Sequence, residues 1–266
     1  MYPLRIIAVI GAALAAIYGI FSPHDITLLW RIPLAFLVGI LAVYIALWLV
    51  LILISLTISR KKTYAKPNPL YTLGINIGYG LICGTARTRL KITGREKIPQ
   101  GRFLLVCNHL SRFDNMLICM MLGMNPIAFI SKPENFRFPA AGRYMIGCCY
   151  IPVERGSAGR GRAAIERAEE LIRSDISSVG VFPEGRRGNG ESLQKFRAGC
   201  LKIAVNTGCP IVVCAVNNTH KVHKRFPWRS TRVTLDVLDV LSPEGKRTTE
   251  LSEEISVMIS GQLYGK

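Results

Sequence analysis

The sequence has few acidic side chains: 17 Asp and Glu stand against 34 Lys and Arg, which gives a formal charge of +17 over 266 residues. A chain so poor in negative charge does not suit a basic partner. Its partners are expected to be acidic, which leaves nucleic acid, anionic lipid headgroups or a phosphorylated substrate. The length and the positive mean hydropathy of +0.29 suit one domain with a membrane-seeking addition.

Several chemical motifs are missing as well. The eight cysteines include no Cys-x-x-Cys pair, so neither a zinc site nor a disulfide framework is indicated, and no metal site is expected. Reduced, buried thiols in a cytosolic domain are the simpler account. His220 and His223 form a pair without further ligands, for which a loop is expected. No Gly-x-Ser-x-Gly nucleophile elbow occurs, which speaks against a hydrolase with an acyl-serine intermediate.

Charged side chains are absent from residues 6–21 and 32–59. A helix over the first stretch would be about 24 Å long against a hydrocarbon core of about 30 Å, so its length is marginal, whereas the second is long enough to span. The first segment would span, re-enter or lie at the interface. A cleaved signal peptide is the remaining alternative, which the closely following second segment disfavours. Together the two stretches predict a hydrophobic helical hairpin.

A basic cluster, Arg60-Lys61-Lys62, directly follows the second stretch. The positive-inside bias therefore places the rest of the chain in the cytoplasm, with residues 22–31 as a short outer or in-membrane turn. The sequence predicts a membrane-anchoring helical hairpin over residues 1–62. A cytosolic domain at the cell membrane is expected over residues 63–266.

Short apolar runs alternate with helical patterns throughout the second part. Strands are expected at 89–92, 103–107, 127–130, 149–153, 179–182, 210–216 and 233–241. Helices are expected at 70–83, 113–123, 159–173, 196–205 and 249–263. This alternation predicts α/β layers.

The strongest chemical signal lies at Asn108 to Asp114, where an apolar run ends and a helix is expected to begin. On one regular helix His109 and Asp114 would point about 140° apart, but across a strand-to-helix turn they can meet. The carboxylate would then hold one imidazole nitrogen and make the other available for general-base catalysis. Ser111 and Asp114 also fit a capping box, in which Asp114 only caps the helix. These residues alone leave both interpretations open.

Three further groups of residues lie at expected strand ends. Residues 182–188 follow a buried strand at the edge where α/β sheets bind ligands, although a plain turn with solvated arginines also fits. Arg155 follows the strand-like run 149–153, and Lys132 follows another strand. Cys107 offers a covalent Cys-His alternative, but a thiol on an apolar strand is more typical of packing.

Four ordered blocks in this chain resemble those of the 1-acylglycerol-3-phosphate acyltransferase family. They are Asn-His-x-Ser-x-x-Asp at 108–114, Ile-Pro-Val-x-Arg at 151–155, Phe-Pro-Glu-Gly-x-Arg at 182–187 and Cys-Pro-Ile-Val-Val at 209–213. The resemblance implies a mixed sheet flanked by helices and preceded by a hydrophobic hairpin. It also implies acyl transfer from acyl-CoA or acyl carrier protein to the free hydroxyl of lysophosphatidic acid, without a cofactor.

The resemblance assigns a role to each matching residue. It implies that His109 is the general base and that Asp114 orients it. It implies that the acceptor is bound by Lys132, Arg155, Glu184, Gly185 and Arg187. Three departures stand where the family often has Thr, Ser and Pro, namely Arg186, Gly188 and Val213, and none of them removes a proposed catalytic group.

Other acceptors and other classes of protein remain open. Another lysophospholipid or glycerol 3-phosphate would be acylated by the same chemistry. The basic and aromatic stretch 221–232 also fits a membrane-tethered nucleic-acid binder, but no nucleic-acid module is present and the same residues suit an anionic membrane surface. We therefore expect a lysophospholipid, an acyl donor and an anionic membrane as partners, and no nucleic acid.

Overall fold

The computed structural model describes residues 2–22, 27–153 and 158–265. Its centre is a seven-stranded sheet with the order β1-β7-β6-β2-β5-β3-β4. The strands are β1 (Thr88–Thr93), β2 (Leu104–Cys107), β3 (Ile127–Ser131), β4 (Ile151–Pro152), β5 (Ser178–Val181), β6 (Ile211–Asn217) and β7 (Thr231–Leu241). Only the pair β6 and β7 is antiparallel within this sheet, and the other five pairs are parallel. The expected mixed sheet is therefore confirmed.

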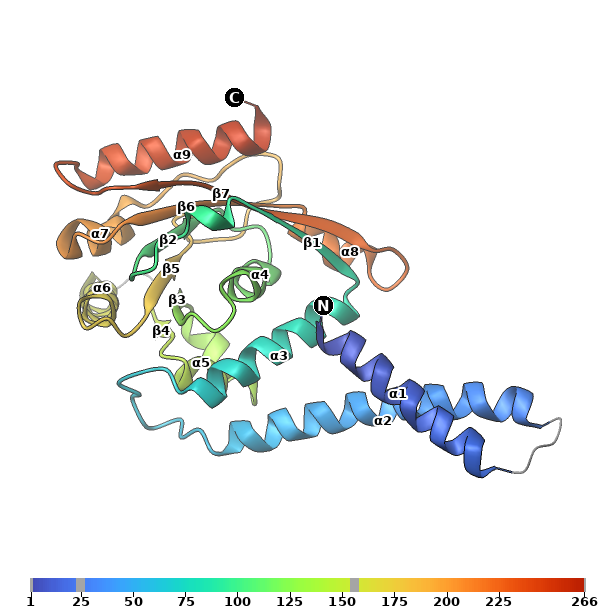
Figure 1. The fold of residues 1–266 in the computed structure, drawn as a ribbon. Coiled ribbons are helices and arrows are strands. Elements are labelled where there is room, and N and C mark those ends of the chain that lie inside the picture. Colours follow the sequence, from blue (N-terminus) through green and yellow to red (C-terminus); the bar gives the residue numbers. More distant parts are fainter. Residues whose placement is uncertain (1, 23–26, 154–157, 266) are drawn as a thin grey trace.

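Helices cover both faces of the sheet (Figure 1). The α-helices of the described residues are α1 (Tyr2–Phe21), α2 (Leu28–Leu56), α3 (Pro69–Thr85), α4 (Phe113–Leu122), α5 (Ala141–Gly147), α6 (Ala158–Arg173), α7 (Lys202–Thr207), α8 (Val222–Arg225) and α9 (Thr248–Tyr264). One apolar core joins α3, α4 and α5 to the sheet, and a second joins α6, α7 and α9 to the opposite face. The α/β layers expected from the sequence are present.

Strand β2 shows how the sequence builds these two cores. All four of its side chains are buried. Leu105 and Cys107 belong to the core under α4, whereas Leu104 and Val106 belong to the opposite core, because successive side chains of a strand point to opposite faces. The sequence of a strand buried between two helical layers is therefore a continuous apolar run.

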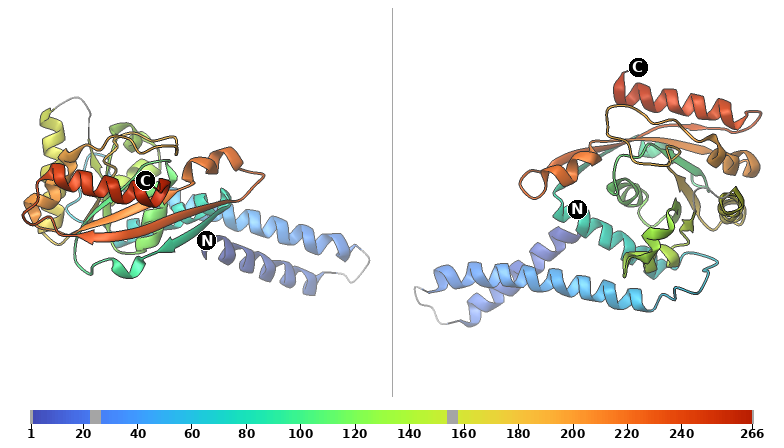
Figure 2. Two further views of the ribbon diagram at one scale, coloured as in Figure 1. Left: turned by 90° about the horizontal axis from the view of Figure 1, so that it is seen from above. Right: turned by 180° about the vertical axis from the view of Figure 1, so that it is seen from behind.

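The helices α1 and α2 form an antiparallel hairpin that projects from the domain (Figures 1 and 2). Both are long and apolar enough to cross a membrane, by length and composition. Helix α2 begins before the charge-free stretch and includes Arg31. The guanidinium of Arg31 lies 5.9 Å from the centre of the Tyr18 ring and donates to the Thr27 hydroxyl at 3.3 Å. This charge is therefore accommodated at the end of an otherwise apolar helix.

The carboxyl-terminal end of α2 and the residues directly after it pack on the domain. Leu51 and Ile58 are buried in the same core as α3, α4 and α5. The Tyr144 hydroxyl donates to the carbonyl of Leu51 at 2.8 Å, and Arg143 donates to the carbonyl of Ile58 at 2.6 Å. The division at residue 62 stays a prediction, and the residues on its two sides share one apolar core.

Two elements are shorter than the sequence pattern predicts. The strand expected at 149–153 is reduced to Ile151–Pro152, because Cys149 has a left-handed backbone with φ of 59°. The helix expected from residue 196 begins as a 3-10 helix at Ala198. Arg197 is still extended there, and its backbone N–H donates to the carbonyl of Pro183 at 2.9 Å.

Candidate active site

The carboxyl ends of β2, β5 and β6 lie side by side because these strands are parallel neighbours. The Asn108 side chain closes this edge. Its amide donates to the carbonyl of Val216 at 2.9 Å and accepts from the N–H of the same residue at 2.8 Å. The start of the 108–114 turn is therefore tied to the end of β6.

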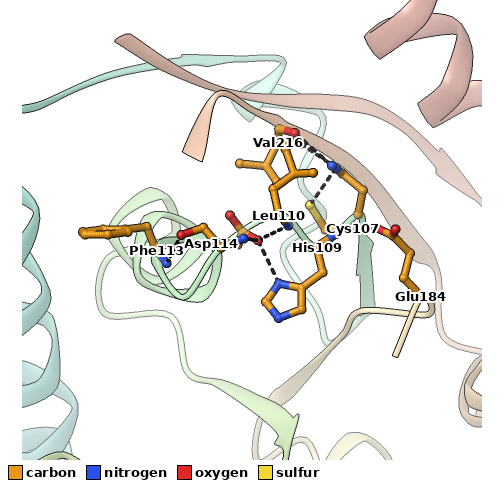
Figure 3. Close-up of polar contacts among 9 residues, drawn as sticks. Cys107, His109, Leu110, Phe113, Asp114, Glu184 and Val216 are labelled. Carbon is orange, nitrogen blue, oxygen red and sulfur yellow. Dashed lines mark hydrogen bonds and ion pairs between the residues drawn. The ribbon is translucent and has the colours of Figure 1, made fainter. Parts of the chain in front are cut away.

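His109 and Asp114 meet across this turn, as their spacing predicts (Figure 3). The distance from Nδ1 of His109 to Oδ2 of Asp114 is 2.8 Å. The same oxygen accepts the backbone N–H groups of Leu110 at 2.7 Å and Ser111 at 2.8 Å. The two interpretations of Asp114 are thus compatible, because one carboxylate both orders the turn before α4 and holds the imidazole.

The surroundings of the pair differ at its two ends. The Asp114 side chain is fully buried, whereas 22% of the His109 side chain is exposed. With Asp114 as the acceptor, the hydrogen of the neutral imidazole lies on Nδ1. The lone pair then lies on Nε2, at the partly exposed end of the ring. This arrangement suits a general base.

Two phenylalanine rings fix the plane of the imidazole. The ring of Phe182 stacks on His109 with a centroid distance of 4.3 Å and an interplanar angle of 19°. Phe129 stacks on Phe182 in turn, with a centroid distance of 5.7 Å and an interplanar angle of 11°. Gly180 leaves room for this second ring, since a Cβ there would lie 2.5 Å from it. The sequence pattern gave no indication of this stack.

Glu184 supports the backbone of His109 from the neighbouring strand end. Its carboxylate accepts the N–H of His109 at 2.6 Å and the N–H of Gln194 at 2.9 Å, and only 4% of the residue is exposed. The N–H of Gly188 donates to the carbonyl of His109 at 2.7 Å. Burial raises the pKa of the Glu184 carboxyl, while the two N–H groups act in the opposite direction. The Glu184 carboxylate therefore contacts backbone groups of the site.

Gly185 makes the turn that brings Glu184 inward. Its φ is 67°, a left-handed conformation that favours glycine. Its N–H donates to the carbonyl of Phe182 at 3.0 Å. A Cβ at this position would also lie 3.2 Å from the Arg197 side chain. The left-handed backbone therefore favours a glycine here, and the Arg197 side chain would have to shift to admit a Cβ.

The predicted basic residues follow strands that end at the same edge. Lys132 follows β3 and Arg187 follows β5, and both are exposed. Arg155 lies outside the described residues. The structure thus brings Lys132 and Arg187 to the edge that carries His109, and their proposed contact with an acceptor stays a prediction.

Cys107 does not have the features of a nucleophile. It is fully buried, and its thiol lies 3.7 Å from the Asn108 amide oxygen. Burial raises the pKa of this thiol well above its usual value, and the neighbouring Cys214 acts in the same direction. The thiol is therefore held in its protonated form, which disfavours the covalent alternative. Within the described residues no group of three or more His, Cys, Asp or Glu side chains is placed to hold a metal ion.

This fold and site define an α/β domain with a His-Asp pair at the carboxyl edge of its sheet. Residues 89–217 match the family model described as Acyltransferase. The resemblance found in the four sequence blocks is thereby confirmed. The match includes the turn at 108–114 and the loop that carries Glu184.

Curated relatives agree with this family. The chain is 29% identical over 136 residues to a 1-acyl-sn-glycerol-3-phosphate acyltransferase of Borreliella burgdorferi, covering 51% of this chain and 54% of that protein. It is 24% identical to the enzyme of the same name from Haemophilus influenzae, covering 60% and 76%. It is 30% identical to a lyso-ornithine lipid O-acyltransferase of Pseudomonas aeruginosa, covering 51% and 50%. The chain thus spans about half the length of the first of these relatives.

A solved structure supports the fold over the whole chain. It is the 1-acyl-sn-glycerophosphate (LPA) acyltransferase PlsC from Thermotoga maritima, with a TM-score of 0.59 and 20% sequence identity. The similarity covers 100% of this chain and 97% of that one, and so includes the amino-terminal helices. The expected fold class, a mixed sheet with flanking helices behind a hydrophobic hairpin, is confirmed.

Proposed function

We propose that this protein transfers a fatty acyl chain from an acyl thioester to the free hydroxyl of lysophosphatidic acid and so forms phosphatidic acid. The observation that carries the proposal is the 2.8 Å contact between Nδ1 of His109 and Oδ2 of Asp114 at the carboxyl edge of the sheet. The names of the two bacterial glycerophosphate acyltransferases support the choice of acceptor.

The chemistry requires one positioned base. Nε2 of His109 takes the proton of the acceptor hydroxyl while the hydroxyl oxygen attacks the thioester carbon. The anionic tetrahedral intermediate then collapses, the bond from carbon to sulfur breaks, and the imidazolium returns its proton to the thiolate. Asp114 stabilises the imidazolium during both steps. A thioester is already activated, so the reaction needs no cofactor, and either acyl-CoA or acyl carrier protein would serve as donor.

Basic side chains at the same edge provide a site for the acceptor phosphate. Lys132 and Arg187 extend from the ends of β3 and β5, and Arg155 belongs to the second sequence block. A guanidinium binds phosphate through two parallel hydrogen bonds, so arginine suits this role. We assign Glu184 and Gly185 to the loop that presents Arg187.

The hairpin places the reaction at a membrane. We expect α1 and α2 to insert into the bilayer, and the basic cluster at residues 60–62 to keep the domain on the cytoplasmic side. A membrane rich in anionic lipid would attract the net positive charge of the chain. The lysolipid acceptor would then reach the site without leaving the membrane, which avoids exposing its acyl chain to water at about 0.8 kcal/mol per methylene group.

A second acceptor is supported by the similarity to the lyso-ornithine lipid acyltransferase. Gly188, which departs from the usual third block, lies next to Arg187 and would alter acceptor preference. The test is an acceptor screen with the purified protein and mass-spectrometric detection of products. Lysophosphatidic acid should be the preferred acceptor over lyso-ornithine lipid, glycerol 3-phosphate and lysophospholipids with larger headgroups. Preference for another acceptor would overturn the substrate, and the absence of any acyl transfer would overturn the reaction.

A further inference from the structure

The turn formed by residues 221–229 exposes aromatic and basic side chains together. We call this segment the basic-aromatic turn. Trp228 is 84% exposed and Phe226 is 45% exposed. The exposed basic residues of the segment are Lys221, Lys224, Arg225 and Arg229. Residues 192–235 contain no Asp or Glu, so the surrounding sequence does not neutralise this charge.

The exposed rings belong to a well-anchored segment. Val222 is fully buried and fixes α8 to the core. The N–H of Phe226 donates to the carbonyl of Val222 at 3.0 Å, and the Arg87 guanidinium donates to the carbonyl of Pro227 at 3.1 Å. The turn therefore holds Trp228 in the solvent-exposed position. A large aromatic side chain held outside the core is typical of an interaction surface.

The positive surface continues onto the edge of the sheet. Strand β1 pairs in parallel with β7, and this register places Arg89 opposite Arg232. Both residues are exposed, as is Arg87, which directly precedes β1. Like charges directly opposite each other on a sheet disfavour the pairing unless an anionic partner neutralises them. The chemistry of the surface therefore fits a partner with several negative charges.

The position of the turn favours a membrane over a soluble partner. In three views α8 lies on the side of the domain from which the helical hairpin projects (Figures 1 and 2). Phe226 lines a cavity of about 340 Å³ together with Tyr44 of α2 and Phe113 of α4. The turn thus borders a helix whose free surface carries exposed leucine, isoleucine and valine side chains. A partner bound there would lie beside the bilayer.

We propose that the basic-aromatic turn, with Arg87, Arg89 and Arg232, is a second membrane contact that binds anionic lipid headgroups. The arginines and lysines bind the headgroup phosphates, and the rings of Phe226 and Trp228 enter the interfacial region, where tryptophan is favoured. This contact would orient the domain toward its lipid acceptor, and its role in catalysis rests on the proposed function.

Trp228 provides a direct probe in the full-length protein. Replacing Trp30 and Trp48 by phenylalanine leaves Trp228 as the single tryptophan. This variant is reconstituted into bilayers of phosphatidylcholine alone or with about 30 mol% phosphatidylglycerol, each with lipids brominated near the headgroup. Trp228 fluorescence should be quenched and shifted to shorter wavelength in the anionic bilayer. Salt at about 1 M should reverse the effect because it screens surface charge.

A matched pair of variants tests the role of the charges. Lys224→Gln with Arg225→Gln should weaken the docking equilibrium about 30-fold, which is about 2 kcal/mol at about 1.4 kcal/mol per tenfold, and should reduce Trp228 quenching accordingly. Arg162→Gln with Lys202→Gln removes two exposed charges from α6 and α7, and should leave the quenching unchanged.

Several outcomes would overturn the proposal. The first is equal quenching of Trp228 in neutral and anionic bilayers, and the second is an equal loss of Trp228 quenching in the two double variants. The third is a change in Trp228 fluorescence with acidic acyl carrier protein in detergent but none with anionic lipid. The last outcome would assign the surface to a protein partner. The fluorescence readout requires no turnover, so a protein that docks but transfers no acyl group would contradict the proposed function and leave this inference standing.

Discussion

Glu184 accepts a hydrogen bond from the backbone N–H of His109 at 2.6 Å, across 75 positions of sequence. The carboxylate thereby fixes the backbone of the proposed base from the strand end next to it. Because it also accepts the N–H of Gln194, one side chain joins the 108–114 turn to the loop after β5. We therefore assign Glu184 a positioning role in the site.

Glu184→Gln should lower both activity and stability. Only one atom of the new amide can accept, so one N–H would face the amide nitrogen, and losing a hydrogen bond to a charged group costs about 1.5 to 3 kcal/mol. We expect kcat to fall about tenfold, because small displacements of a catalytic group are costly. Glu191→Gln, which changes an exposed acid of the same loop, is the control. Equal effects of the two substitutions on kcat would exclude the positioning role.

The same substitution has a predicted pH dependence. Burial raises the pKa of the Glu184 carboxyl above its ordinary value of 4.5. Its contribution to stability is therefore fully present below that ordinary value and decreases as the pH rises through the folded-state pKa. The melting temperature of the wild type minus that of Glu184→Gln should decrease as the pH rises above 4.5. A difference that increases over this interval would contradict the assigned direction.

His109→Ala should reduce kcat by about three orders of magnitude or more, because it removes the proposed base. The side chain is partly exposed, so the melting temperature should change little. Asp114→Asn should reduce kcat somewhat less, but it should lower the melting temperature more, because the buried carboxylate accepts three hydrogen bonds. Steady-state kinetics and thermal melts check both. Activity of His109→Ala within about tenfold of the wild type would exclude the general-base mechanism.

The contact between His109 and Asp114 could be predicted from the sequence because it is local. A buried apolar run, a five-residue spacing and a helix start together confine the two side chains to one turn. The edge of the sheet on which they lie also followed from the alternation of strands and helices.

The contacts of Glu184 and Phe182 could not be predicted in the same way. They depend on β2 lying next to β5 and on the register of that pair, which places the loop after Val181 beside His109. The strand order depends on the packing of the whole sheet, so it cannot be predicted from a local sequence pattern. The shared core of α2 and the domain was missed for a related reason. The sequence pattern places Ile58 in a membrane segment, whereas its burial depends on α3 and α5.

Arg187→Ala should raise the KM for the lysolipid acceptor by about tenfold to a hundredfold, because a charged hydrogen-bonded contact is worth about 1.5 to 3 kcal/mol. The KM for the acyl donor should stay nearly unchanged, and Arg155→Ala should behave in the same way. Arg186→Ala is the matched control, since that guanidinium is held by the Gln194 side chain at 2.6 and 3.0 Å. A defect confined to the donor would show that Arg187 binds the donor phosphates.

Ile58→Ala tests whether α2 belongs to the folded core or is only a tether. Ile58, which lies two residues after the end of α2, is fully buried against the domain, whereas Leu53 of α2 is 63% exposed. Removing a buried isoleucine side chain costs about 2 to 5 kcal/mol, since it forfeits apolar burial and leaves a cavity. Thermal melts in detergent should therefore show a melting temperature lowered by about 5 °C or more for Ile58→Ala, and little change for Leu53→Ala. If both substitutions lowered it equally, the packing of α2 on the domain would not contribute to the stability of the fold, and the hairpin would serve as an anchor alone.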